Sequence, residues 1–220
     1  MKLSKESMRL YAVTDRMWLG ENLLSRQVEE CIRGGATFVQ LREKNIFFEE
    51  YVALAKEIKK VTDKHNIPFV INDEVDVAIA CGADGVHVGQ KDMQACDVRD
   101  KVGDMILGVS AQTVEQAVLA EKMGADYIGV GAVFSTTTKL DANAVSYETV
   151  KAICQAVSIP VVLIGGITKQ NIMQLKGSGA DGVAVVSAIF AQDNILEAAR
   201  EMRNLSDSCF LKRYSIPQTP

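Results

Sequence analysis

Eight short apolar runs, separated by helical stretches, limit most strongly what this 220-residue chain can fold into. The runs are rich in Val and Ile and are mostly continuous rather than alternating, which is typical of parallel strands buried on both faces. They occupy residues 10–15, 38–43, 69–73, 85–89, 106–111, 127–133, 161–166 and 182–188. The sequence therefore predicts eight strands in a parallel sheet.

Helical patterns fill the intervals between these runs. From 48 to 61, apolar residues recur every three or four positions with Lys and Glu opposite, which predicts a surface helix. Thr113 and Ser146 precede two similar stripes and are typical N-cap residues, and another stripe follows Asp193. The chain is thus expected to alternate strand and helix eight times.

A weak internal repeat indicates how the sheet closes. Gly-Ala-Thr or Gly-Ala-Asp stands before every second strand, at 35–37, 82–84, 124–126 and 179–181. Gly suits a helix C-cap, and the small Ala lets a short turn pass under the sheet. A quasi-fourfold pattern favours a closed barrel over an open doubly wound sheet. We expect an α/β fold, a single (β/α)8 TIM barrel over 1–205, and a C-terminal tail over 206–220.

The composition argues against several classes of protein. A net charge of −4 does not suit a duplex-binding surface, which needs a basic face. There is neither a signal-like segment nor an apolar run near 18 residues, so we expect a cytoplasmic protein with small-molecule partners and no nucleic acid or membrane partner. The five cysteines are widely spaced without a CxxC pair, which indicates reduced thiols.

The segment FVQLREK (38–44) carries the densest polar pattern. A strand period of two places Gln40, Arg42 and Lys44 on one face, with Val39 and Leu41 on the other. Burying an unpaired ion costs several kcal/mol, which is much of the roughly 5–15 kcal/mol stability of a domain. Two cations in one inward row therefore need an anion, and phosphate is the obvious candidate.

The active site of such a barrel lies where the strands end, so the polar residues that follow each run are expected to converge there. Besides 40–44, these are Asn72, Asp73, Asp92, Ser110, Thr136, Thr137, Thr138, Lys139, Gly165, Gly166 and Ser187.

Two binding tasks can be separated within this set. The Gly165-Gly166 turn with Thr168 opening a helix, and Ser187 after the last strand, would present backbone N–H groups to a phosphate. The simpler interpretation of the glycines is a tight turn. Asp73 and Asp92 suit a Mg²⁺ ion that bridges phosphate oxygens, and the alternative is that each Asp begins a helix.

Other polar residues allow less specific interpretations. Lys139 follows four hydroxyl residues, 135–138, which could close over anionic oxygens or form a solvated loop. We expect structural roles for His65 and His87, because neither has a nearby catalytic partner in sequence. Tyr11 and Trp18 fit either the pocket rim or the core.

The ordered motifs QLREK, VIND, HVGQKDM, GVSAQT, STTTK, IGGI and VVSAI, between about 10 and 190, resemble the thiamine phosphate synthase family. The resemblance implies joining of 4-amino-2-methyl-5-(diphosphooxymethyl)pyrimidine to a thiazole phosphate, with release of pyrophosphate and with Mg²⁺ as cofactor. Two positions depart from the family pattern: Gln112 stands where relatives often have His, and Thr137 where they often have Pro or Glu. These departures bear on substrate affinity rather than on the type of reaction.

The resemblance also implies roles for individual residues. The pyrimidine diphosphate would be bound by Gln40, Leu41, Arg42, Glu43, Lys44, Asn72, Ser110 and Lys139, and its Mg²⁺ by Asp73 and Asp92. The thiazole phosphate would be held by Thr136, Thr137, Thr138, Gly166, Val186 and Ser187.

A mechanism follows as a hypothesis. The aminopyrimidine methylene tolerates cationic character, so Mg²⁺, Arg42, Lys44 and Lys139 would stabilise the departing diphosphate before the thiazole nitrogen attacks. Ser110 belongs to the same catalytic set, and no general base is required. Three alternatives remain: a thiazole tautomerase of the same fold, a Schiff-base aldolase or isomerase that uses Lys44 or Lys139, and a non-catalytic phosphate sensor. The joint presence of Asp73, Asp92 and Lys139 favours the synthase.

Overall fold

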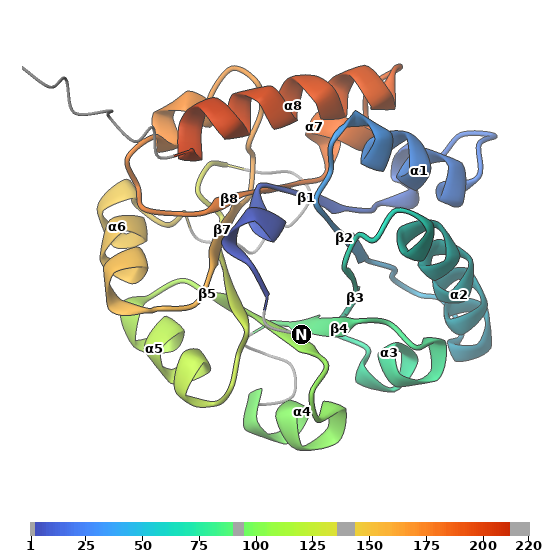
Figure 1. Cartoon of the computed structure of the whole chain (residues 1–220), viewed down its shortest axis with the longest axis horizontal. Helices are drawn as coiled ribbons and strands as arrows, with labels where there is room; N and C mark the ends of the chain where they lie inside the picture. The colour runs from blue at the N-terminus through green and yellow to red at the C-terminus, as the bar shows by residue number, and fades with distance from the viewer. Residues whose placement is uncertain (1–2, 90–94, 136–143, 212–220) are drawn as a thin grey trace, which may run out of the picture.

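A computed structural model of the chain describes residues 3–89, 95–135 and 144–211. Its parallel strands pair in chain order and close into a barrel, with β1 hydrogen-bonded to both β2 and β8 (Figure 1). The strands are β1 (Leu10–Val13), β2 (Phe38–Leu41), β3 (Phe69–Asn72), β4 (Gly85–Val88), β5 (Ile106–Ala111), β6 (Tyr127–Val130), β7 (Val161–Ile164) and β8 (Gly182–Val185). The predicted (β/α)8 barrel is confirmed.

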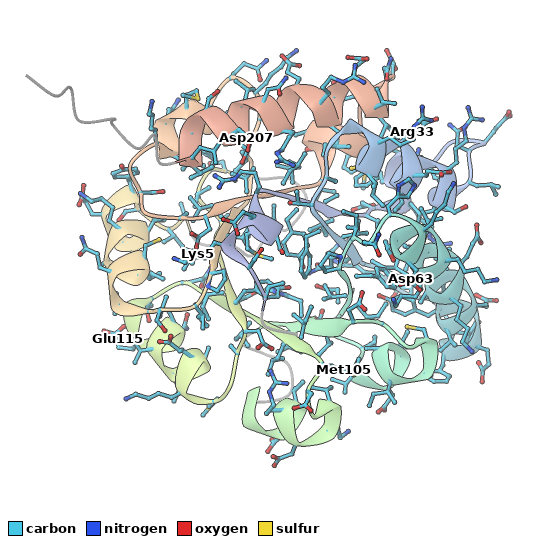
Figure 2. The ribbon with its side chains drawn as sticks, viewed as in Figure 1. Lys5, Arg33, Asp63, Met105, Glu115 and Asp207 are labelled. Carbon is cyan, nitrogen blue, oxygen red and sulfur yellow. The ribbon has the colours of Figure 1, made fainter. Side chains whose placement is uncertain are left out.

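Helices surround the barrel, and charged side chains such as Glu115 on α5 lie at the periphery (Figure 2). They are α1 (Leu24–Gly34), α2 (Phe48–Lys64), α3 (Val75–Cys81), α4 (Ala95–Val102), α5 (Val114–Lys122), α6 (Tyr147–Ala156), α7 (Ser187–Phe190) and α8 (Ile195–Phe210). Short 3₁₀ helices are η1 (Lys5–Met8), η2 (Arg16–Trp18) and η3 (Ile172–Leu175). Thr113 and Ser146 cap α5 and α6 through their side chains, as predicted.

The connection after β7 differs from the expectation. Within the described residues it contains η3 rather than an α-helix, so the helix predicted to open at Thr168 is wrong. The side chain of Asn171 accepts a hydrogen bond from the Thr168 N–H at 2.8 Å and donates one to the Gly166 carbonyl at 2.8 Å. Asn171 thereby folds the backbone into a compact loop, because Asn competes for backbone groups that a helix would use.

The last helix also differs from the expectation. It continues through Phe210, into the segment 206–220 that was predicted to be a tail. Ser206 and Cys209 are buried, and the Ser206 hydroxyl donates to the carbonyl of Arg9 just before β1. The sequence concealed this packing because a buried Ser interrupts the apolar stripe without ending the helix.

The hydrophobic core has two parts. An interior cluster fills the barrel and consists of Met8, Tyr11, Val13, Phe38, Val70, Ile106, Tyr127, Val162 and Ala184. A larger shell cluster, mostly aliphatic, lies between the strands and the helices. On β2, Val39 and Leu41 belong to the shell while Phe38 belongs to the interior, which confirms the predicted period of two over this strand.

The Gly-Ala-Thr and Gly-Ala-Asp repeat forms a fourfold fastening at the N-terminal end of the barrel. Its third residue accepts a hydrogen bond from a backbone N–H near the start of the preceding strand. The pairs are Thr37 with Leu10 (2.9 Å), Asp84 with Phe69 (2.8 Å), Asp126 with Leu107 (2.8 Å) and Asp181 with Val161 (2.9 Å). All four repeat glycines have positive φ. Gly35, Gly82 and Gly124 stand at or directly after the C-cap of an α-helix, as predicted, whereas Gly179 lies three residues beyond the C-cap of η3.

The four described cysteine side chains are free thiols, and burial raises the pKa of Cys31 to about 12. Among the described residues, no helix has both the length and the apolar character needed to cross a membrane.

Candidate active site

Four polar residues lie near the C-terminal ends of four successive strands, β2 to β5. Gln40 on β2 is buried and donates to the Tyr11 hydroxyl at 2.6 Å. Asn72 on β3 lies in register with His87 on β4, and Ser110 on β5 lies 2.9 Å from the His87 Nε2 atom. Three predicted site residues, Gln40, Asn72 and Ser110, thus lie at or one residue before the C-terminal ends of their strands.

The predicted cationic row is shorter than expected. Strand β2 ends at Leu41, so the period of two no longer governs the residues that follow. The Arg42 side chain is 18% exposed and lies 3.7 Å from the Asp15 carboxylate, whereas Lys44 is exposed. Arg42 therefore has an internal counter-charge, whereas the exposed Lys44 does not continue a buried cationic row.

Leu41 and Glu43 turn away from the barrel mouth. The Leu41 side chain is fully buried in the shell cluster. The Glu43 side chain is 4% exposed, and its Oε2 atom accepts from Arg16 at 2.7 Å. Burial raises the pKa of Glu43, and its Oε1 atom has no hydrogen-bond partner within the described part of the chain. Glu43 thus joins the β2–α2 connection to η2.

Asp73 stands directly after β3 in a conformation that few residues adopt. Its φ of 63° is left-handed, and among non-glycine residues Asp and Asn tolerate this region best. The backbone N–H of Asp73 donates to the His87 carbonyl at 2.8 Å, and the Asn72 amide donates to its carboxylate at 2.6 Å. The N-cap of α3 is Glu74, so Asp73 does not begin that helix. Backbone strain of this kind is characteristic of functional sites.

The exposed Asp73 carboxylate suits a hard divalent cation, which prefers oxygen ligands. Within the described ranges, no group of three or more His, Cys, Asp or Glu side chains could hold a metal ion. The second expected ligand, Asp92, lies outside the described residues, as do Thr136, Thr137, Thr138 and Lys139.

Gly165 and Gly166 form a tight turn where two loops touch. Their φ values are 103° and 60°, in the region that favours glycine. A Cβ atom at Gly166 would lie 2.3 Å from the Ser135 carbonyl oxygen, and one at Gly165 would lie 2.5 Å from the Ala132 Cβ atom. The glycines are therefore needed for the loop after β7 to pack against the loop after β6, which supports the tight-turn interpretation without opposing a phosphate role.

Helix α7 begins at Ser187, as expected, but β8 ends at Val185, earlier than the predicted strand over 182–188. Val186 precedes it without a capping side chain, and Ser187 is exposed. The first N–H groups of a helix have no acceptor within the helix. In (β/α)8 barrels the loops after the seventh and eighth strands and a short extra helix frequently bind phosphate, so the arrangement of α7 fits that task.

The sequence interpretation missed a group of interior residues. The Tyr127 hydroxyl lies 2.8 Å from the Tyr11 hydroxyl and 2.9 Å from His87 Nδ1. Burial raises the pKa of both tyrosines. One available signal was glycine inside strands: a Cβ atom at Gly108 would lie 2.1 Å from the Tyr127 ring, and one at Gly129 would lie 3.0 Å from His87. Interior glycines of this kind indicate large rings on neighbouring strands.

Gln112, which departs from the family pattern, is fixed at the end of β5. Its side-chain amide donates to the Gly131 carbonyl at 3.2 Å, and its backbone N–H donates to the Gln116 side chain at 2.7 Å. The residue thus links β5 to the end of β6.

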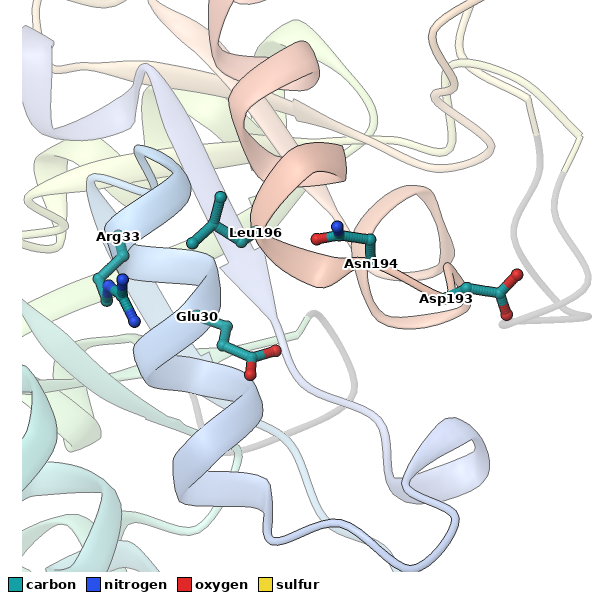
Figure 3. A pocket seen from close by; sticks show the side chains of 5 residues that line it. All are labelled: Glu30, Arg33, Asp193, Asn194 and Leu196. Atoms are coloured by element: carbon teal, nitrogen blue, oxygen red, sulfur yellow. The ribbon is translucent and has the colours of Figure 1, made fainter.

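A separate polar cavity of about 360 Å³ lies outside the barrel, between α1 and the start of α8 (Figure 3). It is lined by Glu30, Arg33, Asp193, Asn194 and Leu196, none of which is a predicted site residue.

A closed parallel barrel with polar residues gathered where its strands end is the arrangement of a (β/α)8-barrel enzyme. The model of the family described as thiamine monophosphate synthase matches residues 10–189. The chain belongs to this family and is a transferase.

Relatives from bacteria and an archaeon agree with this assignment. A thiamine-phosphate synthase of Ruminiclostridium cellulolyticum is 53% identical over 200 residues, which cover 90% of this chain and 95% of that protein. One of Clostridium tetani is 51% identical over 194 residues, covering 88% and 93%. The solved structure of thiamine phosphate pyrophosphorylase from Pyrococcus furiosus has a TM-score of 0.87 and 36% identity, covering 93% of this chain and 98% of that one.

Proposed function

We propose that the chain is a thiamine-phosphate synthase, which joins 4-amino-2-methyl-5-(diphosphooxymethyl)pyrimidine to a thiazole phosphate and releases pyrophosphate. The observation that carries the proposal is the 53% identity to a thiamine-phosphate synthase over 90% of the chain. The positions of Gln40, Asn72 and Ser110 near the C-terminal ends of their strands agree with it.

The proposal includes Mg²⁺, which Asp73 and Asp92 would hold. The exposed carboxylate of Asp73, oriented by the Asn72 amide, supports this role. A bound Mg²⁺ would supply positive charge against the oxygens of the leaving diphosphate.

The chain's own residues would act by position and charge. Arg42 and Lys44, together with Lys139, would neutralise the diphosphate, and preorganised charge of this kind contributes several kcal/mol to catalysis. Arg42 is suited to the task because Asp15 holds its guanidinium near the mouth. The Asn72 amide and the Ser110 hydroxyl would bind the pyrimidine diphosphate and fix its orientation.

The second substrate would be held on the opposite side of the mouth. Gly166, Val186 and Ser187, with Thr136 to Thr138, would bind the phosphate of the thiazole. Holding both substrates in one orientation converts a bimolecular encounter into a step within a single complex. The scheme requires no general base. A cytoplasmic location is part of the proposal, because reduced cysteines are typical of that compartment.

The decisive test is to mix both phosphorylated substrates with the chain, with and without Mg²⁺, and to measure pyrophosphate and thiamine phosphate. We expect both products in equal amounts, and only with both substrates and the metal present. Lys169→Ala, on the exposed surface, serves as a control variant with unchanged turnover.

Three results would overturn the proposal. Hydrogen exchange into the thiazole phosphate without pyrophosphate release would indicate a tautomerase. Borohydride trapping of a carbonyl substrate on Lys44 or Lys139 would indicate Schiff-base chemistry. Binding of thiazole phosphate without any turnover would indicate a sensor.

A further inference from the structure

A continuous chain of hydrogen bonds crosses the barrel interior and joins two site residues. Its members, in order, are Gln40, Tyr11, Tyr127, His87 and Ser110, and the successive distances are 2.6, 2.8, 2.9 and 2.9 Å. The two ends belong to the proposed pyrimidine diphosphate site. The three inner residues have no role in the proposed function so far.

The donors and acceptors in this series of hydrogen bonds run in one direction. The Gln40 amide nitrogen donates to the Tyr11 oxygen, so the single proton of the Tyr11 hydroxyl is directed at Tyr127. The Tyr127 proton is then directed at Nδ1 of His87. If the inner bonds ran the other way, a hydroxyl proton of Tyr11 or Tyr127 would be left without an acceptor. Both tyrosines are almost fully buried, and an unsatisfied buried donor is unfavourable.

The direction determines what Ser110 can do. Because Nδ1 of His87 accepts, the imidazole proton is on Nε2 and is donated to the Ser110 oxygen. The Ser110 hydroxyl proton is thus turned away from His87. If the hydrogen bonds ran in the opposite direction, Ser110 would donate its only proton to the imidazole. It could then offer nothing but lone pairs to an anion.

Packing holds the inner rings in place. Ring centroids are 4.5 Å apart for Tyr11 and Phe38, 5.6 Å for Phe38 and Tyr127, and 5.4 Å for His87 and Tyr127. The Tyr127 and His87 rings occupy the space that side chains at Gly108 and Gly129 would need. The rings therefore cannot turn without moving the strands, and the series of hydrogen bonds is preorganised.

We propose that Tyr11, Tyr127 and His87 are positioning residues that hold His87 as the Nε2–H tautomer and thereby make Ser110 a hydrogen-bond donor to an anionic diphosphate. The ligand in this statement rests on the proposed function. The tautomer does not, because it is a property of the protein without substrate.

The tautomer can be read by ¹⁵N NMR of histidine-labelled protein. The chain has two histidines, and His65→Gln identifies the signal of His87. At about pH 8, above the ordinary histidine pKa of about 6.5, we expect a protonated Nε2 and an unprotonated Nδ1 for His87. Tyr127→Phe removes the donor to Nδ1 and should loosen this preference. Tyr51→Phe, which loses a buried hydroxyl bonded to the Leu41 carbonyl in the shell, should leave it unchanged. A proton on Nδ1 of His87 overturns the proposal, whether or not the chain makes thiamine phosphate.

Kinetics test whether the inner residues act through Ser110. We expect Tyr127→Phe to lower kcat/KM for the pyrimidine diphosphate about tenfold, as the loss of one oriented hydrogen bond does, and to leave KM for the thiazole phosphate unchanged. Combined with Ser110→Ala, it should add almost nothing to the effect of Ser110→Ala alone. Independent, multiplying effects, or equal changes in both KM values, would indicate a purely structural role and overturn the proposal.

Discussion

The two ends of the barrel use aspartate for opposite purposes. At the N-terminal end, Asp84, Asp126 and Asp181 accept backbone N–H groups and fasten neighbouring strands. At the C-terminal end, Asp73 stands exposed in a left-handed conformation that contributes strain rather than strength. The difference teaches that stability and chemistry are separated along the barrel axis, as is general for this fold. Variants at one end should therefore change one property and spare the other.

The largest effect is expected from Asp73→Asn. Asparagine tolerates the left-handed conformation but lacks the charge, so the fold should be kept and the proposed metal ligand lost. We expect kcat for pyrophosphate release to fall about 10²–10³-fold, with the free energy of unfolding changed by less than about 0.5 kcal/mol. Steady-state kinetics and urea unfolding on the same preparation check both. Full turnover would remove Asp73 from the metal site.

Asp126→Ala should show the opposite behaviour. The Asp126 carboxylate accepts from the Leu107 N–H at 2.8 Å and binds the Arg99 guanidinium at 2.7 Å. The substitution therefore removes one partner from each of these two donors. We expect a loss of about 2–3 kcal/mol in the free energy of unfolding, with kcat unchanged at 25 °C. Asp104→Ala, an exposed aspartate in the turn before β5, is the matched control and should change neither. A reduced kcat in Asp126→Ala would show that the two ends are coupled.

Thr37→Val tests the neutral member of the same fourfold repeat. Valine has nearly the same shape but no hydroxyl, so the Leu10 N–H and the Ser7 carbonyl each lose a hydrogen bond. We expect the free energy of unfolding, measured with denaturant, to decrease by about 1–2 kcal/mol. Thr37→Ser keeps the hydroxyl and should restore most of the difference. Equal losses in the two variants would point to the methyl group instead.

The smallest effect concerns acid stability at the N-terminal end. A hydrogen bond from the Ser158 side chain lowers the pKa of Glu121. A lowered pKa stabilises the fold above the unfolded value of about 4.3, and this contribution disappears as pH falls through the folded pKa. Glu121→Gln should therefore cost about 0.5–1 kcal/mol at pH 7, since the residue is only half-buried, and nothing at about pH 3. Unfolding curves of both proteins at the two pH values measure this cost. An equal loss of unfolding free energy at both would show that the charge of Glu121 does not contribute to stability.

Local patterns predicted the barrel well because its strands and caps are local features. Each of the signals can be recognised from a few consecutive residues. They are the continuous Val- and Ile-rich runs, the N-caps at Thr113 and Ser146 and the repeat before alternate strands. The period of two placed Gln40 inside correctly. The helix predicted to begin at Thr168 was wrong because the Asn171 side chain bonds to the Thr168 N–H and the Gly166 carbonyl and holds this backbone in a loop.

Features that depend on distant partners could not be predicted in the same way. His87 was expected to be structural, because its partners Ser110 and Tyr127 lie 23 and 40 residues away. The left-handed backbone of Asp73 depends on its bond to the His87 carbonyl on the next strand. The fastening role of Asp84, Asp126 and Asp181 was hidden for the same reason, although their repeat was recognised.

The pairing of β1 with both β2 and β8 has a consequence for biosynthesis. The first strand leaves the ribosome early, but its β8 partners, Val183 to Val185, are translated much later, and Ser206, which donates to the Arg9 carbonyl, lies 197 residues after Arg9. Until then a growing polypeptide exposes an unpaired edge, which invites aggregation. Chaperone occupancy on stalled nascent chains should therefore persist until β8 and α8 have left the ribosome.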